Sequence, residues 1–327
     1  WYQLRKIMKN KCLYCYEPIG GESDFHEKCS LEFFGTPTPP EIEYSLDQMD
    51  ELAKKVVERS VAVPGVQPKL SMSLVKQITE SSDTRLTVVG ASGGHYILKP
   101  PSDRFPEIPE NEHLTMRIAE SSGIQVVPSS LIRLSSGELS YVTKRVDRKE
   151  PGEKIHMIDM FQITEAFDKY KSSMEKVGKA LGAYSSNPLL DKTFFFDLAV
   201  FSFLTGNIDM HLKNFSMIEI ESGWAMSPAY DLLNVAIVLP EDLEEMALSI
   251  LGKKRKLKKE HFEQLGERLG LTSKQIRGSF NRMIRNKSKA RDWIDRSFLS
   301  TEMKTAYKEL LKERYTRLGL TEDTGAK

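Results

Sequence analysis

Apolar and polar residues follow different periods in the two halves of the chain. Before residue 150, several short segments alternate apolar and polar positions, which is typical of half-buried strands. These predicted strands cover 70–75, 85–89, 95–100, 126–134 and 139–146, and the last two form a hairpin around Ser135 to Glu138. Helical periodicity in this half is limited to 46–59 and to a segment from Ile108 to Ala119. The first half is therefore expected to be rich in strands.

The second half has mainly helical periodicity. Helices are predicted over 157–167, 172–182 and 190–204, and again in the region after residue 258. The third of these is apolar nearly all round, so it should be buried. Two short strands, 215–220 and 224–226, should pair across Glu221 to Gly223. The chain is thus predicted to be an α+β protein with a small β-rich N-lobe and a larger helical C-lobe.

Composition narrows the function classes only a little. The 327 residues carry a net charge of +1, which gives no general attraction to nucleic acid or to anionic membranes. No apolar run reaches the ~20 residues of a membrane span, and the N-terminus lacks the apolar region of a signal peptide. Met8 is a candidate start, with residues 1–7 an upstream extension. Three cysteines in a chain without an export signal favour a reducing compartment, the cytoplasm.

All three cysteines lie in one short N-terminal segment that also contains a histidine. Cys12 and Cys15 are separated by two residues, and His26 and Cys29 likewise. Two such pairs can close a tetrahedral zinc site with three thiolates and one imidazole. A segment of this size cannot bury enough apolar surface to fold alone, so the metal would drive its folding. Residues 8–40 are therefore predicted to be a structural zinc-knuckle-like module, within which Gly35 to Pro40 form a linker or a turn.

A polar segment follows the apolar helix of the second half. Asp209 is followed five positions later by Asn214, and Asp231 comes after the next predicted hairpin. A protein kinase arranges its base and its metal ligands in this order. Asp209 is thus the candidate base, and Asn214 and Asp231 are candidate Mg²⁺ ligands. Lys213 could steady the γ-phosphate, and His211 is expected to brace the loop rather than act as a base.

Candidate nucleotide-binding residues precede this segment. Lys99 ends a predicted strand, where a kinase places the lysine that pairs with nucleotide phosphates. Glu112 is the candidate to orient it, with Glu110 as an alternative that periodicity cannot exclude. In the same layout, the backbone of Lys144 and Val146 could bond adenine. The candidate phosphate loop runs from Ser60 to Lys69 and includes Gly65, Val66, Gln67 and Lys69.

These motifs together resemble those of HipA-type serine/threonine kinases, the toxins of HipBA-like type II toxin–antitoxin modules. The resemblance is closest to the short HipT-like members, which lack the N-terminal subdomain of full-length HipA. It covers about residues 60–320 and rests on six segments in order: Gly65-Val-Gln-Pro-Lys-Leu70, Tyr96-Ile-Leu-Lys-Pro100, Pro109-Glu-Asn-Glu112, Lys144-Arg-Val-Asp-Arg148, Gly206-Asn-Ile-Asp-Met-His-Leu-Lys-Asn-Phe-Ser216 and Ser227-Pro-Ala-Tyr-Asp-Leu-Leu233.

The resemblance implies a bilobal, protein-kinase-like (HipA-like) fold that uses ATP and Mg²⁺. The small lobe would be 41–148 and the catalytic lobe 149–327. It also implies phosphorylation of an aminoacyl-tRNA synthetase, which arrests translation and leads to growth arrest or persistence. The expected partner is a HipB-like helix-turn-helix antitoxin, a small antitoxin resembling the missing subdomain, or both. DNA would be contacted only through the antitoxin, and no membrane would be involved.

The sequence departs from the family at two places. Family members carry an autophosphorylated serine three residues before the loop glycine, where this chain has Ala62. Ser60, Ser71 or Ser73 could take that role, or this control is absent. A hinge acid common in full-length members is Lys144 here, which argues against a side-chain contact to adenine. The zinc-like module lies outside the kinase core, and we expect it to brace the small lobe or to dock the antitoxin.

Two other functions are compatible with parts of the sequence. A catalytically silent, kinase-like regulator would share the fold, although every chemical position is filled by a competent residue. A zinc-dependent nucleic-acid-binding protein would use the cysteine cluster and the basic run from Lys253 to Lys259. A solvated loop is the simpler interpretation of that run.

Overall fold

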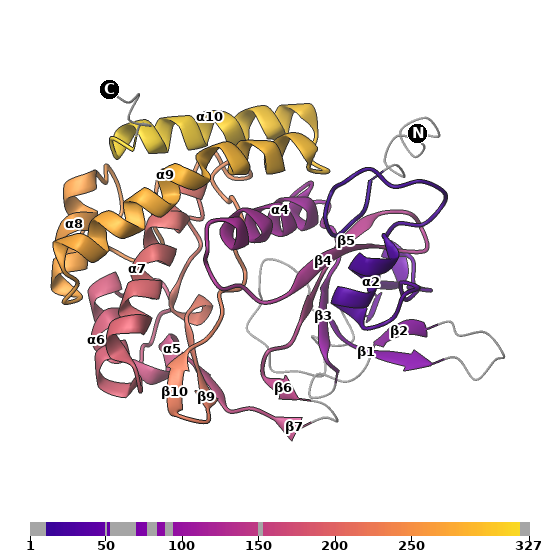
Figure 1. Cartoon of the computed structure of the whole chain (residues 1–327), viewed down its shortest axis with the longest axis horizontal. Coiled ribbons are helices and arrows are strands. Elements are labelled where there is room, and N and C mark those ends of the chain that lie inside the picture. Colours follow the sequence, from indigo (N-terminus) through magenta and orange to yellow (C-terminus); the bar gives the residue numbers. More distant parts are fainter. Residues whose placement is uncertain are drawn as a thin grey trace. The chain divides into compact units, whose positions relative to one another are not determined.

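The computed structural model describes residues 11–49, 51–52, 70–76, 84–88, 94–149 and 153–320. The chain divides into two compact units, which are described separately below (Figure 1). Unit 1 comprises residues 1–113, 127–153 and 296–298, and unit 2 comprises 114–126, 154–295 and 299–327. Both units are therefore built from more than one segment, whereas the sequence suggested the continuous lobes 41–148 and 149–327. The N-terminal module belongs to unit 1.

Unit 1 is built around a five-stranded antiparallel sheet in the order β2-β1-β3-β5-β4. All five strands predicted from the alternating pattern are confirmed. The central strand β3 is flanked by β1 and β5, so its backbone is paired on both sides. A tight turn at Gly137, with φ of 106°, joins the last two strands. The strands are β1 (Leu70–Lys76), β2 (Thr84–Val88), β3 (Tyr96–Lys99), β4 (Ser129–Arg133) and β5 (Leu139–Lys144).

Helical segments and a two-stranded ladder are also described in unit 1. Helix α2 (Glu27–Phe34) belongs to the N-terminal module and ends at Gly35, whose φ of 78° suits glycine. Helix α4 (Ile108–Ser121) contributes its first six residues to this unit. Strands β6 (Arg148–Lys149) and β7 (Glu153–Lys154) form a two-stranded ladder. The helix predicted over 46–59 is present at 46–49 and 51–52, and its other positions lie outside the described residues.

Unit 2 is mainly helical. Helix α7 (Pro188–Thr205) is its core: most of its residues are buried, as the apolar pattern predicted, and it packs against α6, α8 and α10. A three-stranded sheet in the order β10-β9-β8 contains the predicted hairpin. The remaining elements are β8 (Met157–Asp159), α5 (Met160–Ile163), α6 (Met174–Tyr184), η1 (Leu212–Asn214), β9 (Ser216–Ile220), β10 (Gly223–Met226), α8 (Lys259–Arg268), α9 (Ser273–Arg296) and α10 (Thr301–Arg317).

The helix predicted over 157–167 was largely wrong. Residues 157–159 form β8, which pairs with β9, and only the single turn α5 follows. Asp159 caps this turn: its side chain accepts a hydrogen bond from the Gln162 N–H, and the Gln162 side chain bonds the Asp159 N–H in return. A capping box fixes a helix start at this position and releases the preceding residues to the strand. No described helix is long and apolar enough to cross a membrane.

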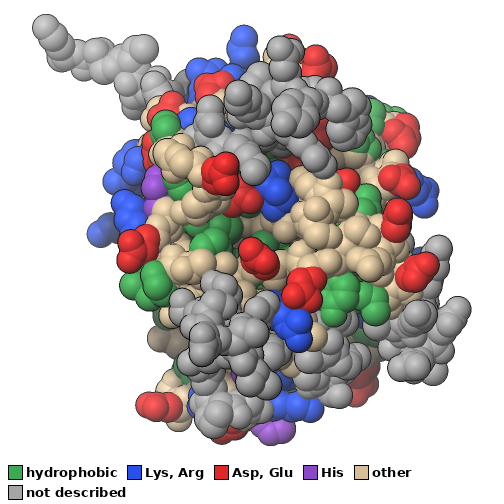
Figure 2. All heavy atoms as spheres, turned by 90° about the vertical axis from the view of Figure 1, so that its right-hand side faces the viewer, with side chains coloured by type: hydrophobic (Ala, Val, Ile, Leu, Met, Phe, Trp, Pro, Cys, Tyr) green, Lys and Arg blue, Asp and Glu red, His purple; other side chains and the backbone are tan. Residues whose placement is uncertain are grey.

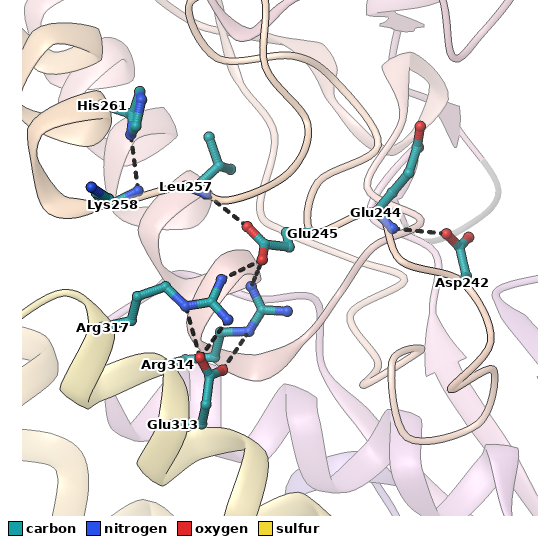
Figure 3. A network of polar contacts seen from close by, with 9 residues as sticks. All are labelled: Asp242, Glu244, Glu245, Leu257, Lys258, His261, Glu313, Arg314 and Arg317. Carbon is teal, nitrogen blue, oxygen red and sulfur yellow. Dashed lines mark hydrogen bonds and ion pairs between the residues drawn. The ribbon is translucent and has the colours of Figure 1, made fainter.

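A buried cluster of charges links distant segments of unit 2 (Figure 3). The Glu245 carboxylate accepts a hydrogen bond from the Leu257 N–H at 2.8 Å and contacts the guanidinium groups of Arg314 and Arg317 on α10. The side chains of Glu245 and Arg314 are only 10% and 8% exposed. Burial lowers the pKa of the Arg314 guanidinium, and Glu245 opposes that shift. Both arginines also contact the more exposed Glu313, but removing Glu245 would leave the buried Arg314 without its buried counter-charge.

We therefore expect Glu245→Ala to lower the free energy of unfolding by about 3–5 kcal/mol. The neighbouring Glu244→Ala provides the control. Glu244 forms a more exposed pair with Lys254, 3.2 Å between Nζ and Oε2, so its loss should cost less than about 1 kcal/mol. Urea denaturation of both variants measures the difference, and equal losses would contradict the assignment of Glu245 as a structural anchor.

Glu110 is a half-buried acid on the first turn of α4. Its Oε2 atom is buried and has no hydrogen-bond partner among the described residues. Burial raises the pKa of its carboxyl group to about 7, and the nearby Glu107 adds to the rise. The folded protein therefore holds this proton more tightly than the unfolded chain does. Stability should fall as the pH rises from the ordinary pKa of 4.5 through about 7, and stay reduced above that.

Glu110→Gln removes this titration. Relative to wild type, the variant should gain stability between pH 5 and pH 8, on the order of 2–3 kcal/mol. Urea unfolding at the two pH values measures the change. Glu309→Gln, on an exposed position of α10, should show no such pH-dependent difference from wild type. A Glu110→Gln curve that runs parallel to the wild-type curve across this range would refute the expectation.

Candidate functional site

The first part of the candidate site is an ion pair in unit 1. Lys99 ends β3, where it lies opposite Tyr141 of β5. Its Nζ atom lies 2.6 Å from Oε1 of Glu112 on α4, and the two side chains are 6% and 1% exposed. The ammonium group also lies 5.3 Å from the centre of the Tyr141 ring. Burial raises the pKa of the Tyr141 phenol, and Glu112 adds to that rise, so this ring stays neutral.

The contact distinguishes the two acids that the sequence left open. Glu112, and not Glu110, is the carboxylate that meets Lys99. Glu110, two residues earlier, points in another direction because successive side chains on a helix are rotated by about 100°. A buried lysine–glutamate pair contributes little net stability, since desolvation opposes the attraction. Such a pair is therefore better explained by function than by folding.

The segment proposed to bind adenine differs from expectation at one atom. The backbone N–H of Lys144 donates to the Pro128 carbonyl at 3.0 Å, so it is not available to a nucleotide. The prediction for this donor is corrected: sheet pairing at the end of β5 has already used it. Val146 lies in the turn that follows. There the Arg145 guanidinium forms a two-fold contact with the Asp147 carboxylate, at 3.0 and 2.7 Å.

The predicted phosphate loop lies outside the described residues. The residues concerned are Gly65, Val66, Gln67 and Lys69, together with the candidate modification site Ser60. The two other candidate serines are described. Ser71 and Ser73 both belong to β1, where they lie opposite Ile97 of β3 and Thr87 of β2.

The second part of the site is the loop that leaves helix α7 in unit 2. The helix ends at Gly206 with φ of 68°, a left-handed conformation. A Cβ atom there would lie 2.7 Å from Oδ1 of Asn234, so glycine is required both by the backbone angle and by the close approach. Three residues later, Asp209 accepts a hydrogen bond from the Tyr170 hydroxyl group at 2.7 Å. Burial is the main cause that raises the pKa of the Tyr170 phenol, and the hydrogen bond to Asp209 raises it further. The phenol therefore stays protonated and remains a donor.

His211 is held by its surroundings. Its Nε2 atom lies 2.9 Å from Nζ of Lys169, and its ring meets the Tyr170 ring edge-on, with centroids 5.1 Å apart. An ammonium can only donate, so Nε2 is the accepting nitrogen of a neutral imidazole. A ring fixed on two sides in this way suits the bracing role expected for His211 better than that of a mobile proton carrier.

Asn214 and Asp231 meet as a pair. The Asn214 Nδ2 group donates to Oδ2 of Asp231 at 2.9 Å. The Asn214 Oδ1 atom is buried and has no hydrogen-bond partner among the described residues. Asp231 has φ of 60°, an uncommon conformation for a residue other than glycine, and one that costs energy. An amide oxygen without a partner beside a carboxylate is a hard-oxygen donor set, which fits a Mg²⁺ ion.

Tyr230 holds the loop between these residues. Its hydroxyl group donates to the Lys213 carbonyl at 2.9 Å and lies 2.6 Å from Oγ of Ser216. The Lys213 ammonium lies 4.9 Å from the centre of the Phe161 ring, a cation–π contact. Lys213 is thus positioned by its backbone and by an aromatic face of α5.

Three residues of the site were missed from the sequence: Lys169, Tyr170 and Tyr230. Tyr230 lies inside the quoted segment Ser227 to Leu233, directly before Asp231, so its position was a usable signal. Lys169 and Tyr170 lie in a loop between α5 and α6, without periodicity or motif. Nothing in the sequence connects them to a segment about 40 positions later, and only the folded chain does.

The N-terminal module brings its four predicted ligands together. One ligand atom from each of Cys12, Cys15, His26 and Cys29 lies within 4.8 Å of the others. The structure thus groups the predicted residues into three sets: the lysine–glutamate pair and the thiol–imidazole cluster in unit 1, and the Asp209 to Asp231 constellation in unit 2.

Comparison with known proteins gives a consistent result. Residues 61–291 match the HipA-like C-terminal domain. A Haemophilus influenzae protein that carries the provisional name of a kinase is 27% identical over 286 residues, 82% of this chain and 78% of that protein. The serine/threonine-protein kinase toxin HipA of Shewanella oneidensis is 27% identical over 211 residues, 58% of this chain but only 46% of that protein.

A solved structure supports the fold. The HipA structure from Shewanella oneidensis, determined with HipB and its operator DNA, aligns with a TM-score of 0.64 at 20% identity, over 86% of this chain and 75% of that one. The kinase-like, HipA-like fold predicted from the sequence is thereby confirmed. Because the domain match covers most of the chain, this protein belongs to the HipA-type kinase toxin family.

Proposed function

We propose that the chain is an ATP- and magnesium-dependent serine/threonine protein kinase. The observation that carries this proposal is the buried Lys99–Glu112 pair. In protein kinases the corresponding lysine–glutamate pair must be formed before the lysine can hold the nucleotide phosphates. A buried pair of this kind contributes little net stability, which favours a functional role for it.

The site residues of unit 2 then each have a role in phosphoryl transfer. Asp209 orients the substrate hydroxyl group and accepts its proton, while the hydroxyl oxygen bonds to the γ-phosphorus and the bond to the β-phosphate breaks. Tyr170 and His211 hold this loop in place. Asn214 and Asp231 would hold Mg²⁺, which when bound supplies positive charge against the phosphates. Lys213 contributes a further positive charge near the transferred group.

We further propose that this kinase is the toxin of a type II toxin–antitoxin module. The family membership supports this, and the substrate class proposed is an aminoacyl-tRNA synthetase in the cytoplasm, whose phosphorylation would arrest translation. The proposed partner is a HipB-like helix-turn-helix antitoxin, a small antitoxin resembling the subdomain that short members lack, or both. The Shewanella oneidensis relative was solved with HipB and operator DNA. Here, DNA would be reached through the antitoxin.

The nucleic-acid alternative gains little support. On the face shown in Figure 2, acidic and basic side chains of the described residues are interspersed and form no broad basic patch. In the basic run, Lys254 pairs with Glu244, and Lys259 lies 5.5 Å from the centre of the Phe280 ring. These lysines are thus engaged within unit 2.

Loss of the base tests the proposed chemistry. Asp209→Asn keeps the hydrogen bond from Tyr170 but removes the proton acceptor, so phosphate transfer from labelled ATP should fall roughly 10²–10⁴-fold. Glu241→Gln, at an exposed position of the same unit, should transfer phosphate as wild type does. Incubation with a cell lysate, followed by phosphopeptide analysis, identifies the substrate. A wild-type protein that labels neither itself nor any lysate protein would support the silent regulator instead.

Loss of the ion pair tests the nucleotide site. Glu112→Gln should leave Lys99 without its orienting charge and raise the KM for ATP by about tenfold or more. Glu110→Gln changes the same helix two residues earlier, without touching Lys99, and should keep the wild-type KM. Steady-state kinetics at varied ATP concentrations measure the KM of both variants. Equal KM values for the two variants would show that Lys99 does not act on the nucleotide.

A further inference from the structure

The N-terminal module presents a second cluster of chemically active side chains, separate from the kinase constellation. Cys12 and Cys15 lie in a turn closed by the Tyr16 N–H, which donates to the Cys12 carbonyl at 2.9 Å. His26 precedes helix α2, and Cys29 lies in its first turn. Two short segments thus each supply two ligands, the arrangement of zinc knuckles.

The distances fit a closed tetrahedral site. The Nδ1 atom of His26 lies 3.4 Å from Sγ of Cys15 and 3.8 Å from Sγ of Cys29. Zinc bonds of normal length separate a sulfur ligand from a nitrogen ligand by about 3.6 Å. All four ligand atoms lie within 4.8 Å of one another, and the three thiols are free rather than disulfide-bonded. The atoms are therefore already placed for a common ion.

The second nitrogen of His26 gives independent support. Nε2 lies 3.0 Å from the Pro18 carbonyl oxygen, which can only accept a hydrogen bond. Nε2 therefore carries the proton, and Nδ1 presents its lone pair to the three sulfurs. Metal-binding histidines are typically oriented in this way, by a carbonyl on the nitrogen that does not bind the metal.

The module is attached to the elements that carry the ion pair. The Tyr16 hydroxyl group lies 2.9 Å from Nδ1 of His113, the residue after Glu112 on α4. Asp24 forms a two-fold contact with Arg133 of β4, 2.9 Å for each bond. The rings of Phe33 and Phe34 lie 6.0 and 6.2 Å from that of Tyr96, the first residue of β3. Each contact belongs to unit 1.

We propose that Cys12, Cys15, His26 and Cys29 bind one structural Zn²⁺ ion, and that this ion fixes the module as a brace for α4 and β3. With four protein ligands the site leaves no open position for catalysis. A module of about 30 residues is too short to form a stable core alone, so the metal supplies the constraint that aligns Tyr16, Asp24, Phe33 and Phe34 with their partners. Zinc thereby positions Glu112 and Lys99 from outside the kinase constellation.

Metal analysis of the purified full-length protein tests the first part. One zinc per chain is expected, and His26→Ala should reduce it severalfold. His26→Cys keeps four ligands and should retain the metal, and His156→Ala, at an exposed position in unit 2, should not change it. Cobalt exchanged into the wild-type protein should give the intense visible bands of a tetrahedral thiolate site, which tests the site without any variant. Absence of metal, a Cys12–Cys15 disulfide, iron in place of zinc, or zinc unaffected by His26→Ala would overturn the proposal.

Hydrogen exchange tests the brace. Removing zinc should lower the thermal midpoint by about 5 °C or more, and Zn²⁺ but not Mg²⁺ should restore it. Amide exchange should accelerate in the module and also in residues 96–99 and 108–113, but not in α9. Acceleration confined to residues 11–40 would leave the metal site standing and overturn the bracing role. Neither readout requires ATP, so a failure here is distinguishable from a failure of the proposed kinase activity.

Discussion

A buried ammonium group must have a carboxylate at contact distance, and this requirement organises unit 1. Lys99 and Glu112 are almost fully removed from water, with 2.6 Å between their charged atoms. At low local dielectric, a shift of either partner by an ångström or two would expose the remaining charge to an uncompensated desolvation cost. The strand and the helix that carry the pair must therefore be held firmly. β3 meets this need by lying inside the sheet, paired to β1 on one side and β5 on the other.

Unit 2 meets a different constraint, because its reactive residues lie in loops rather than on regular elements. The loop has a left-handed residue at each end: Gly206, with φ of 68°, which glycine adopts without strain, and Asp231, with φ of 60°, which costs energy. Between them, hydroxyl groups serve as clamps, with Tyr170 on Asp209 and Tyr230 on the Lys213 carbonyl. A strained loop persists only where its surroundings over-determine it. The aromatic hydroxyls supply that surplus of contacts.

The sequence predicted the elements well and their contacts unevenly. Periodicity identified the five strands of unit 1 and the buried helix α7. Burial on one face produces alternating apolar and polar residues, and burial on all sides produces a continuous apolar run. Periodicity failed at 157–167, because the capping box of Asp159 with Gln162 overrides the apolar pattern. Spacing suggested that Asn214 and Asp231 belong together. It could not separate Glu110 from Glu112, nor foresee that sheet pairing occupies the Lys144 N–H. Such features depend on the rotation of a helix and on strand register, which the residue order leaves undetermined.

The N-terminal module shows how a short segment can be rigid enough to matter. About 30 residues cannot supply the buried area of an independent domain, so they need a cross-link of another kind. A metal ion held by the thiol–imidazole cluster would provide one, while Tyr16 and Asp24 attach the module to α4 and β4. A polar site keeps its geometry only when the residues around it are fixed by packing and hydrogen bonds. The position of Glu112 therefore depends on the contact between Tyr16 and the adjacent His113. The contacts of Tyr16 with His113, and of Phe33 and Phe34 with Tyr96, thus tie this short module to the helix and the strand that carry the ion pair.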